Sequence, residues 1–77
     1  MDHIMSPELK EVLMNVLEID SVSEQDSAET IRTWDSVRQI NLMMAIEEKF
    51  GITFPVEEMP ELTSVKAIAA AIESRRR

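Results

Sequence analysis

The sequence predicts an all-α fold: a small four-helix bundle with three longer helices, one short helix and a long first loop. Two observations support this prediction. Apolar residues recur three or four positions apart in three separate segments, which is the spacing of a buried helix face. No segment combines alternating apolar residues with the tight turn of a β-hairpin. With 77 residues, the chain is expected to form a single domain over residues 1–77.

The first helix is expected from Pro7 to Glu18. Ser6 can cap its start, proline suits the first helical position, and Glu8 suits the positive end of the helix. One apolar face follows at helical spacing and consists of Leu9, Val12, Leu13, Val16 and Leu17.

Residues 19–35 lack such a face and are rich in Ser, Thr and Asp, which favour turns and caps. A structureless loop of about 17 residues is unusual in a compact domain. We therefore expect this segment to be tied to the core or to be functional. Its candidate anchors are apolar: Ile19, Val22, Ile31 and Trp34.

The second helix is expected to start near Asp35 and Ser36 and to end at Phe50, before Gly51. At about 100° per residue, one wide arc is the expected core face. It contains Ile40, Leu42, Met43, Ile46 and Phe50. A separate stripe contains Val37, Asn41, Met44 and Glu48. Its apolar members either contact a partner or are isolated exposed residues, and periodicity alone leaves both interpretations open.

The remaining segments predict a connector, a short helix and a last helix. Residues 52–55 are expected to be extended, and Val56–Met59 to form one helical turn that Pro60 ends. Thr63 or Ser64 can cap the last helix. The buried face of that helix is expected to be Val65, Ile68, Ala69 and Ile72.

The charge balance excludes some partners and favours others. The formal net charge is −7, and residues 75–77 hold three of the eight basic residues, so residues 1–74 carry five basic and fifteen acidic side chains. Such a body repels nucleic-acid phosphates and attracts basic protein surfaces. The hydrophobic content of 44% is enough for a core and argues against a disordered acidic tail.

Simple counts exclude several kinds of chemistry. The chain has no Cys, which rules out disulfides, thiolate zinc sites and cysteine nucleophiles. Its single His is His3, near the terminus, so a Ser-His-Asp relay is not expected. No apolar run approaches the ~20 residues of a membrane span. We expect a monomeric cytoplasmic protein with no catalytic residues, no metal site and no membrane insertion.

Ser36 is the most informative polar residue. It lies where an exposed loop becomes a helix, and the N–H groups and dipole of a helix start stabilise an anion, so a phosphate on this hydroxyl would be well placed. Asp35 suits a divalent cation that holds an incoming diphosphate. The same residues also fit a plain cap. Either Ser36 caps in a capping box with Gln39, or Asp35 caps and Ser36 occupies the first helical position. No His or Lys base adjoins Ser36, so another enzyme would have to activate it.

The acidic residues suggest contacts more than catalysis. Neighbouring helical residues diverge by about 100°, so neither Glu47 with Glu48 nor Glu57 with Glu58 forms an acid–base pair on one atom. These pairs are better interpreted as a solvated acidic face for Arg and Lys of partners. Three loop acids lack the spacing of a calcium loop and are better interpreted as solvated side chains: Asp20, Glu24 and Asp26.

Four small or flexible side chains have two interpretations. Met43 and Met59, with Ala67 and Ala71 opposite, could border a space that opens for an apolar guest. Ordinary core packing explains the same residues and is the favoured interpretation.

Two segments resemble the acyl carrier protein family. In that family an Asp-Ser-Leu motif or a close variant opens a helix that ends in Glu-Glu-x-Phe-Gly. Here the corresponding residues are Trp34-Asp35-Ser36-Val37 and Met44-Ala45-Ile46-Glu47-Glu48-Lys49-Phe50-Gly51-Ile52. Leu62-Thr63-Ser64-Val65 and the short amphipathic helix after it are also similar. The resemblance covers nearly the whole chain in the right order.

The resemblance implies a cofactor and a function. Ser36 would carry 4′-phosphopantetheine through a phosphodiester, with Asp35 at the same site. A separate phosphopantetheinyl transferase would supply it from coenzyme A with Mg²⁺. The thiol of the arm would hold an acyl group as a thioester, and the protein would carry that group between enzymes without catalysing a reaction. This agrees with the absence of Cys and of a general base.

The resemblance also implies a recognition surface on the second helix. The matching contacts would be Asp35, Val37, Met44, Glu47 and Glu48, and the stripe derived from periodicity adds Asn41. The expected partners are acyl-loading, acyl-transfer or synthase enzymes with basic docking patches.

Four departures from the family pattern bear on the pathway. Arg38 and Asn41 stand where carriers of bacterial fatty acid synthesis often have acids, Val37 replaces Leu, and Trp34 replaces small residues. Fatty acid, polyketide and specialised lipid biosynthesis all remain open. Two alternative functions are a peptidyl or aminoacyl carrier and, in a different class, an unmodified helical adaptor.

Overall fold

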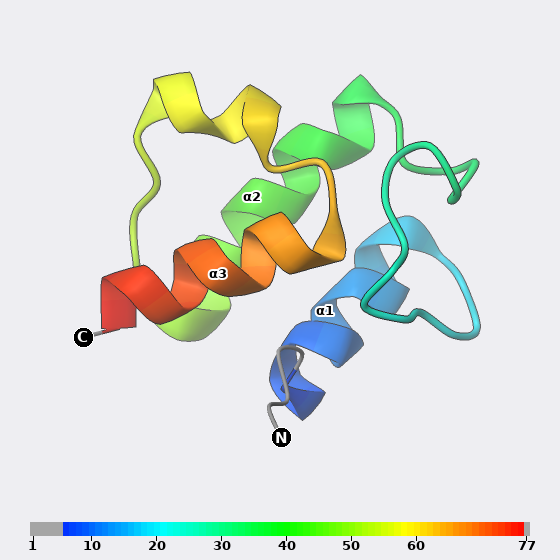
Figure 1. Ribbon diagram of the computed structural model, residues 1–77, viewed down its shortest axis with the longest axis horizontal. Coiled ribbons are helices and arrows are strands. Elements are labelled where there is room, and N and C mark those ends of the chain that lie inside the picture. Colours follow the sequence, from blue (N-terminus) through cyan, green and yellow to red (C-terminus); the bar gives the residue numbers. More distant parts are fainter. Residues whose placement is uncertain (1–5, 77) are drawn as a thin grey trace.

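The computed structural model describes residues 6–76, without the side chain of Arg76, so the expectation for His3 lies outside the described residues. The described chain forms α1 (Pro7–Leu17), α2 (Ser36–Phe50), the 3-10 helix η1 (Val56–Glu61) and α3 (Val65–Arg76), with no strand (Figure 1). The predicted all-α fold of three longer helices and one short helix is confirmed. No helix within residues 6–76 is long and apolar enough to span a membrane.

The first helix begins as predicted and ends one residue earlier. Ser6 Oγ accepts a hydrogen bond from the N–H of Leu9 at 3.2 Å, with Pro7 at the first helical position. Glu18 lies beyond the last turn in the left-handed conformation, with φ 57° and ψ 51°, and its N–H donates to Met14 O. A glycine is common at this position, because L side chains are strained there.

Replacing Glu18 with glycine is therefore expected to stabilise the protein. Relief of the left-handed strain should raise the free energy of unfolding by about 0.5–1 kcal/mol, and the melting temperature by a few degrees. The ion pair lost with Arg38 is long, at 3.7 Å, and Glu18 is mostly exposed, so it offsets little. Thermal unfolding followed by circular dichroism measures the change. The control Glu11→Gly, in the exposed interior of α1, should lower the stability instead.

One core joins the helices. The main helix–helix contact is between α1 and α2, and η1 packs against α2. In the view of Figure 1, α3 passes in front of α2, and buried residues of both helices belong to the same core. The buried members of α1 and α2 are Leu9, Val12, Leu13, Leu17, Leu42, Met43 and Ile46. The predicted face of α3 is confirmed, since Val65, Ile68, Ala69 and Ile72 are all buried.

The prediction that Ile40 belongs to the core face is wrong, because its side chain is 61% exposed. At about 100° per residue, Ile40 lies about 120° from Ile46 and about 160° from Leu42 around the helix. The buried face of α2 is therefore narrower than the apolar arc expected from the sequence. Phe50, near the middle of the arc, is half-buried and packs against the core.

The long loop between α1 and α2 is tied down, as predicted. Val22, Ile31 and Trp34 are buried in the core, and Ile19 packs against it. Backbone bonds fasten the loop to the start of α3: Ala28 N–H donates to Thr63 O at 2.8 Å, and Val65 N–H donates to Asp26 O at 3.0 Å.

The short helix is longer than predicted, and Pro60 lies inside it instead of ending it. The φ of a 3-10 helix is close to the value that the proline ring imposes, so Pro60 costs this helix one N–H donor but no change of direction. The other two boundaries agree with the sequence. Gly51 ends α2 with φ 65°, and Ser64 Oγ accepts from Ala67 N–H at 3.1 Å at the start of α3.

Candidate modification site at the start of α2

Asp35, and not Ser36, caps α2. The Asp35 carboxylate accepts a hydrogen bond from Arg38 N–H at 2.9 Å, and Ser36 is the first helical residue. The capping box of Ser36 with Gln39 is wrong, because the side-chain oxygen of Gln39 accepts from Trp34 Nε1–H at 2.6 Å instead. Ser36 is exposed, and its hydroxyl is left without a capping role.

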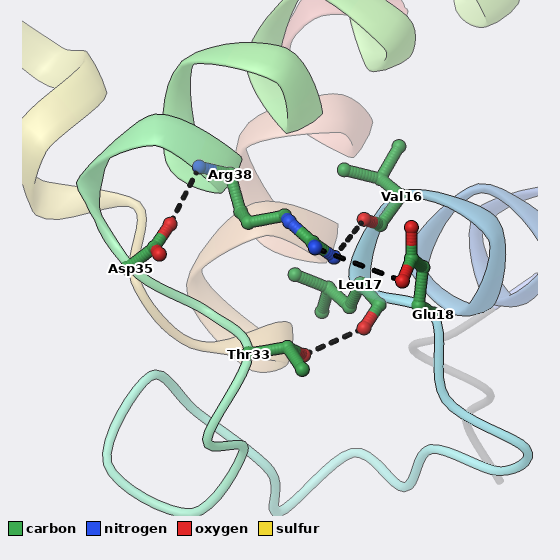
Figure 2. A network of polar contacts seen from close by, with 6 residues as sticks. All are labelled: Val16, Leu17, Glu18, Thr33, Asp35 and Arg38. Carbon is green, nitrogen blue, oxygen red and sulfur yellow. Dashed lines mark hydrogen bonds and ion pairs between the residues drawn. The ribbon is translucent and has the colours of Figure 1, made fainter.

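The start of α2 is fastened to the end of α1 (Figure 2). Arg38 Nη1 donates to Val16 O at 3.0 Å, and Arg38 Nη2 lies 3.7 Å from the Glu18 carboxylate. Thr33 Oγ1 donates to Leu17 O at 2.6 Å. The last turn of α1 has no basic residue of its own. Arg38 therefore supplies the positive charge that the negative end of α1 favours, and two otherwise unpaired carbonyls gain donors.

This network fixes the backbone on both sides of Ser36. Thr33 and Arg38 bond to α1 on either side of the position, while Asp35 bonds within α2 (Figure 2). The Arg38 side chain is 28% exposed, so its charge is directed into the α1–α2 contact and not freely presented to partners. Ser36 is thus an exposed hydroxyl on a rigid helix start.

An open groove of about 530 Å³ adjoins Ser36. It lies between α2 and η1, and most of its lining is apolar. The lining residues are Ala28, Trp34, Asp35, Ser36, Gln39, Ile40, Met43, Val56, Met59, Pro60 and Thr63. The favoured interpretation of the four Met and Ala residues as core packing is confirmed, since Met43 is buried and the other three pack against the core. Met43 and Met59 border the groove, whereas Ala67 and Ala71 pack against the core elsewhere.

An exposed apolar face follows Ser36 along α2. Val37 is 65% exposed and Met44 60%, and both belong to the stripe derived from the sequence. Asn41 and Glu48 are also exposed. The sequence interpretation missed Ile40, which joins this face, although its spacing of three from Val37 and four from Met44 was the available signal. It also missed Val56 of η1, which is 77% exposed and shares the groove with Ile40.

Glu47 differs from the other proposed contacts. It is half-buried, and its Oε2 accepts a hydrogen bond from Phe54 N–H at 2.8 Å. Its carboxylate thus holds the connector that follows α2. Glu48, one residue on, is exposed and lacks this contact.

The other acidic residues do not assemble into a metal site. No group of three or more His, Cys, Asp or Glu that could hold a metal ion occurs in the part of the chain that the structure describes. Of the three loop acids considered, Asp26 accepts from Ser23 N–H and Thr30 Oγ1–H, both at 2.9 Å. In η1, Glu58 pairs with Arg75 at 2.8 Å.

The start of α2 fits a phosphopantetheine group. A phosphodiester on the exposed Ser36 would lie at the positive end of α2, where the helix dipole favours an anion. The Asp35 carboxylate uses one oxygen for its cap and keeps the other for a cation during attachment. The groove beside Ser36 offers an apolar surface to whatever the group carries.

Comparison with known proteins gives one family for this chain. The family described as "Phosphopantetheine attachment site" matches residues 7–72. The chain is 33% identical to an acyl carrier protein of Helicobacter hepaticus, over 88% of this chain and 92% of the relative. It is 30% identical to an acyl carrier protein of Helicobacter pylori, over 90% and 91%. An acyl carrier protein of Campylobacter hominis is 45% identical over a shorter stretch, 52% of this chain and 51% of the relative.

Proposed function

This chain belongs to the acyl carrier protein family, and from that premise we propose that Ser36 bears its 4′-phosphopantetheine arm. As a member of the family it is a carrier and not an enzyme, it binds phosphopantetheine covalently, and it interacts with synthase and transferase enzymes. We propose that it delivers acyl intermediates, held as thioesters, to enzymes of fatty acid, polyketide or specialised lipid biosynthesis.

The proposed attachment is a phosphoryl transfer onto Ser36. Its Oγ attacks the phosphorus that bears the pantetheine of coenzyme A, the bond to the adjoining phosphate breaks, and adenosine bisphosphate leaves. The hydroxyl proton passes to a base of the transferase, since no His or Lys adjoins Ser36 in the sequence. Asp35 would offer its second carboxylate oxygen to the Mg²⁺ that holds the diphosphate. The bound arm supplies the thiol that this sequence lacks.

One observation carries this proposal: Ser36 is exposed at the first position of α2, while the cap is made by Asp35. A serine that capped the helix would have a structural role that explains its presence. Here the hydroxyl is free for modification, and Arg38 and Thr33 hold it in a fixed place for a transferase.

The proposal is tested by incubating the protein with coenzyme A, Mg²⁺ and a broad-specificity phosphopantetheinyl transferase. The intact mass should rise by one phosphopantetheine. An unchanged mass would favour the unmodified adaptor and contradict the proposal. An aminoacyl carrier would accept the same arm, but the relatives named above are acyl carrier proteins, which favours acyl loading.

We further propose that partners dock on Val37, Asn41, Met44, Glu47 and Glu48, together with Asp35. The exposed apolar side chains would enter a pocket, and the acidic ones would meet a basic rim. Arg38 stands where carriers of fatty acid synthesis often have an acid. It adds less positive charge to this surface than the sequence implies, because its guanidinium bonds to α1. We also propose a monomer that acts in the cytoplasm, and the net charge of −7 argues against affinity for nucleic acid.

Glu48→Lys is expected to slow recognition by an enzyme with a basic patch. Reversing an exposed rim charge acts mainly on the association rate, so kcat/KM for loading by the transferase should fall roughly 3- to 10-fold at low salt, and less at high salt. The matched control is Glu29→Lys, which makes the same charge change in the exposed loop. Equal losses for the two variants would show that net charge, and not the face of α2, governs docking.

A further inference from the structure

Gln39 joins three segments beside the groove. Its Nε2 donates to Met59 O at 2.7 Å and to Leu62 O at 2.9 Å, and its Oε1 accepts from Trp34 Nε1–H at 2.6 Å. A side-chain amide has two N–H donors, so both donors of Gln39 are used at the end of η1. This half-buried side chain thus fastens η1 to α2 and to the buried Trp34.

The position of Gln39 relative to Ser36 matters for cargo. Residues three and four positions apart on a helix are neighbours, so an arm attached at Ser36 that folds back along α2 passes Gln39 and Ile40 on its way to the groove. Ile40 lies on the exposed side. On the inner side, Met43 and residues of η1 line the groove, and both Met43 and Leu62 are buried.

A longer chain could pass into the interior only if η1 moved away from α2. That movement would break both bonds of Gln39 to η1 and leave the carbonyls of Met59 and Leu62 without these donors. Breaking hydrogen bonds to partly buried groups is costly when no partner replaces the lost donor, and an alkyl chain has no donor to offer.

We propose that Gln39 is a specificity-determining latch: by fastening η1 to α2, it keeps the acyl group in the open groove and out of the core. The favoured cargo is an acyl group short enough for the groove, because methylenes that extend beyond the groove stay in water and gain no burial. This inference rests on the proposed attachment at Ser36, but the latch itself can be tested on the unmodified chain.

The first experiment measures amide hydrogen exchange of the unmodified protein. Gln39→Met has a side chain of similar volume but makes none of the three hydrogen bonds of Gln39. Gln39→Glu keeps an oxygen that accepts from Trp34 Nε1–H, but it has no N–H groups to donate to Met59 O and Leu62 O. In both variants the Leu62 amide, which bonds to Met59 O, should exchange about tenfold faster, with little change at Leu13 in α1.

The control is Gln25→Glu, the same change in the exposed loop, which should leave the amides of Leu62 and Leu13 unaffected. Equal acceleration in α1, or none at Leu62, would overturn the latch.

The second experiment compares butyryl and dodecanoyl forms by the rate at which hydroxylamine cleaves their thioesters. In the wild type the two rates should be similar, and in Gln39→Met the dodecanoyl thioester should be cleaved about fivefold more slowly, because the opened space shelters the chain. A wild-type dodecanoyl thioester already much better protected than the butyryl one would overturn the inference. Failure of Ser36 to take up the arm would overturn the proposed function instead, and the exchange data would still decide about Gln39.

Discussion

Changing Ser36 to alanine is expected to abolish the gain of one phosphopantetheine on incubation with coenzyme A, Mg²⁺ and a transferase. The reason is chemical, since the variant lacks the oxygen that would form the phosphodiester. The free energy of unfolding should change by no more than about 0.5 kcal/mol, because Ser36 is exposed and does not cap α2. Intact mass and urea unfolding measure the two effects.

Asp35→Ala provides the matched comparison at the neighbouring position. It removes the hydrogen bond to Arg38 N–H, so it should cost about 1 kcal/mol of stability. Loading should slow but continue, because the hydroxyl of Ser36 remains. The two variants thus separate loss of the attachment atom from loss of the Asp35 carboxylate, which both caps α2 and is proposed to hold Mg²⁺. A mass gain in Ser36→Ala would place the arm on another hydroxyl and contradict the assignment.

The sequence was sufficient for features that depend on neighbouring residues. The helix starts at Ser6 and Ser64, the stop at Gly51 and the buried face of α3 all follow from spacing over a few positions. Capping at the start of α2 was left open, because Asp35 and Ser36 are both good caps. The backbone conformation decides which of the two side chains accepts the hydrogen bond from the first turn of α2, and here it is Asp35.

The bonds of Gln39 and Arg38 and the exposure of Ile40 could not be predicted, because they depend on residues far away in the sequence or on small differences in helix orientation. Gln39 bonds to carbonyls 20 and 23 positions away, and Arg38 to one 22 positions away, and no local pattern indicates such partners. Ile40 lies at the edge of the apolar arc of α2, where a small change in the direction of the core around the helix makes a side chain buried or exposed. These are the residues that shape the groove and fix the start of α2, so the site was located from the sequence but its surroundings were not.

Replacing Arg38 with methionine is expected to have the largest effect on stability among these substitutions. It removes a charged donor from Val16 O and a positive charge from the end of α1, where α1 has no basic residue of its own. Hydrogen bonds that involve a charged group contribute about 1.5–3 kcal/mol, and the Arg38 side chain is mostly buried, so a loss of about 2 kcal/mol follows. For a domain of this size the melting temperature should fall by roughly 8–16 °C.

Arg32→Met is the control, because it removes the same charge from an exposed position of the long loop and should change stability by less than about 0.5 kcal/mol. Arg38→Lys should recover only part of the loss, since an ammonium group lacks the fork that reaches both Val16 O and Glu18. If Arg38→Met unfolds at the same urea concentration as the wild type, the contact does not hold α1 to α2. Ser36 would then owe its position to the Thr33 bond and the core alone, and loading kinetics should be unchanged as well.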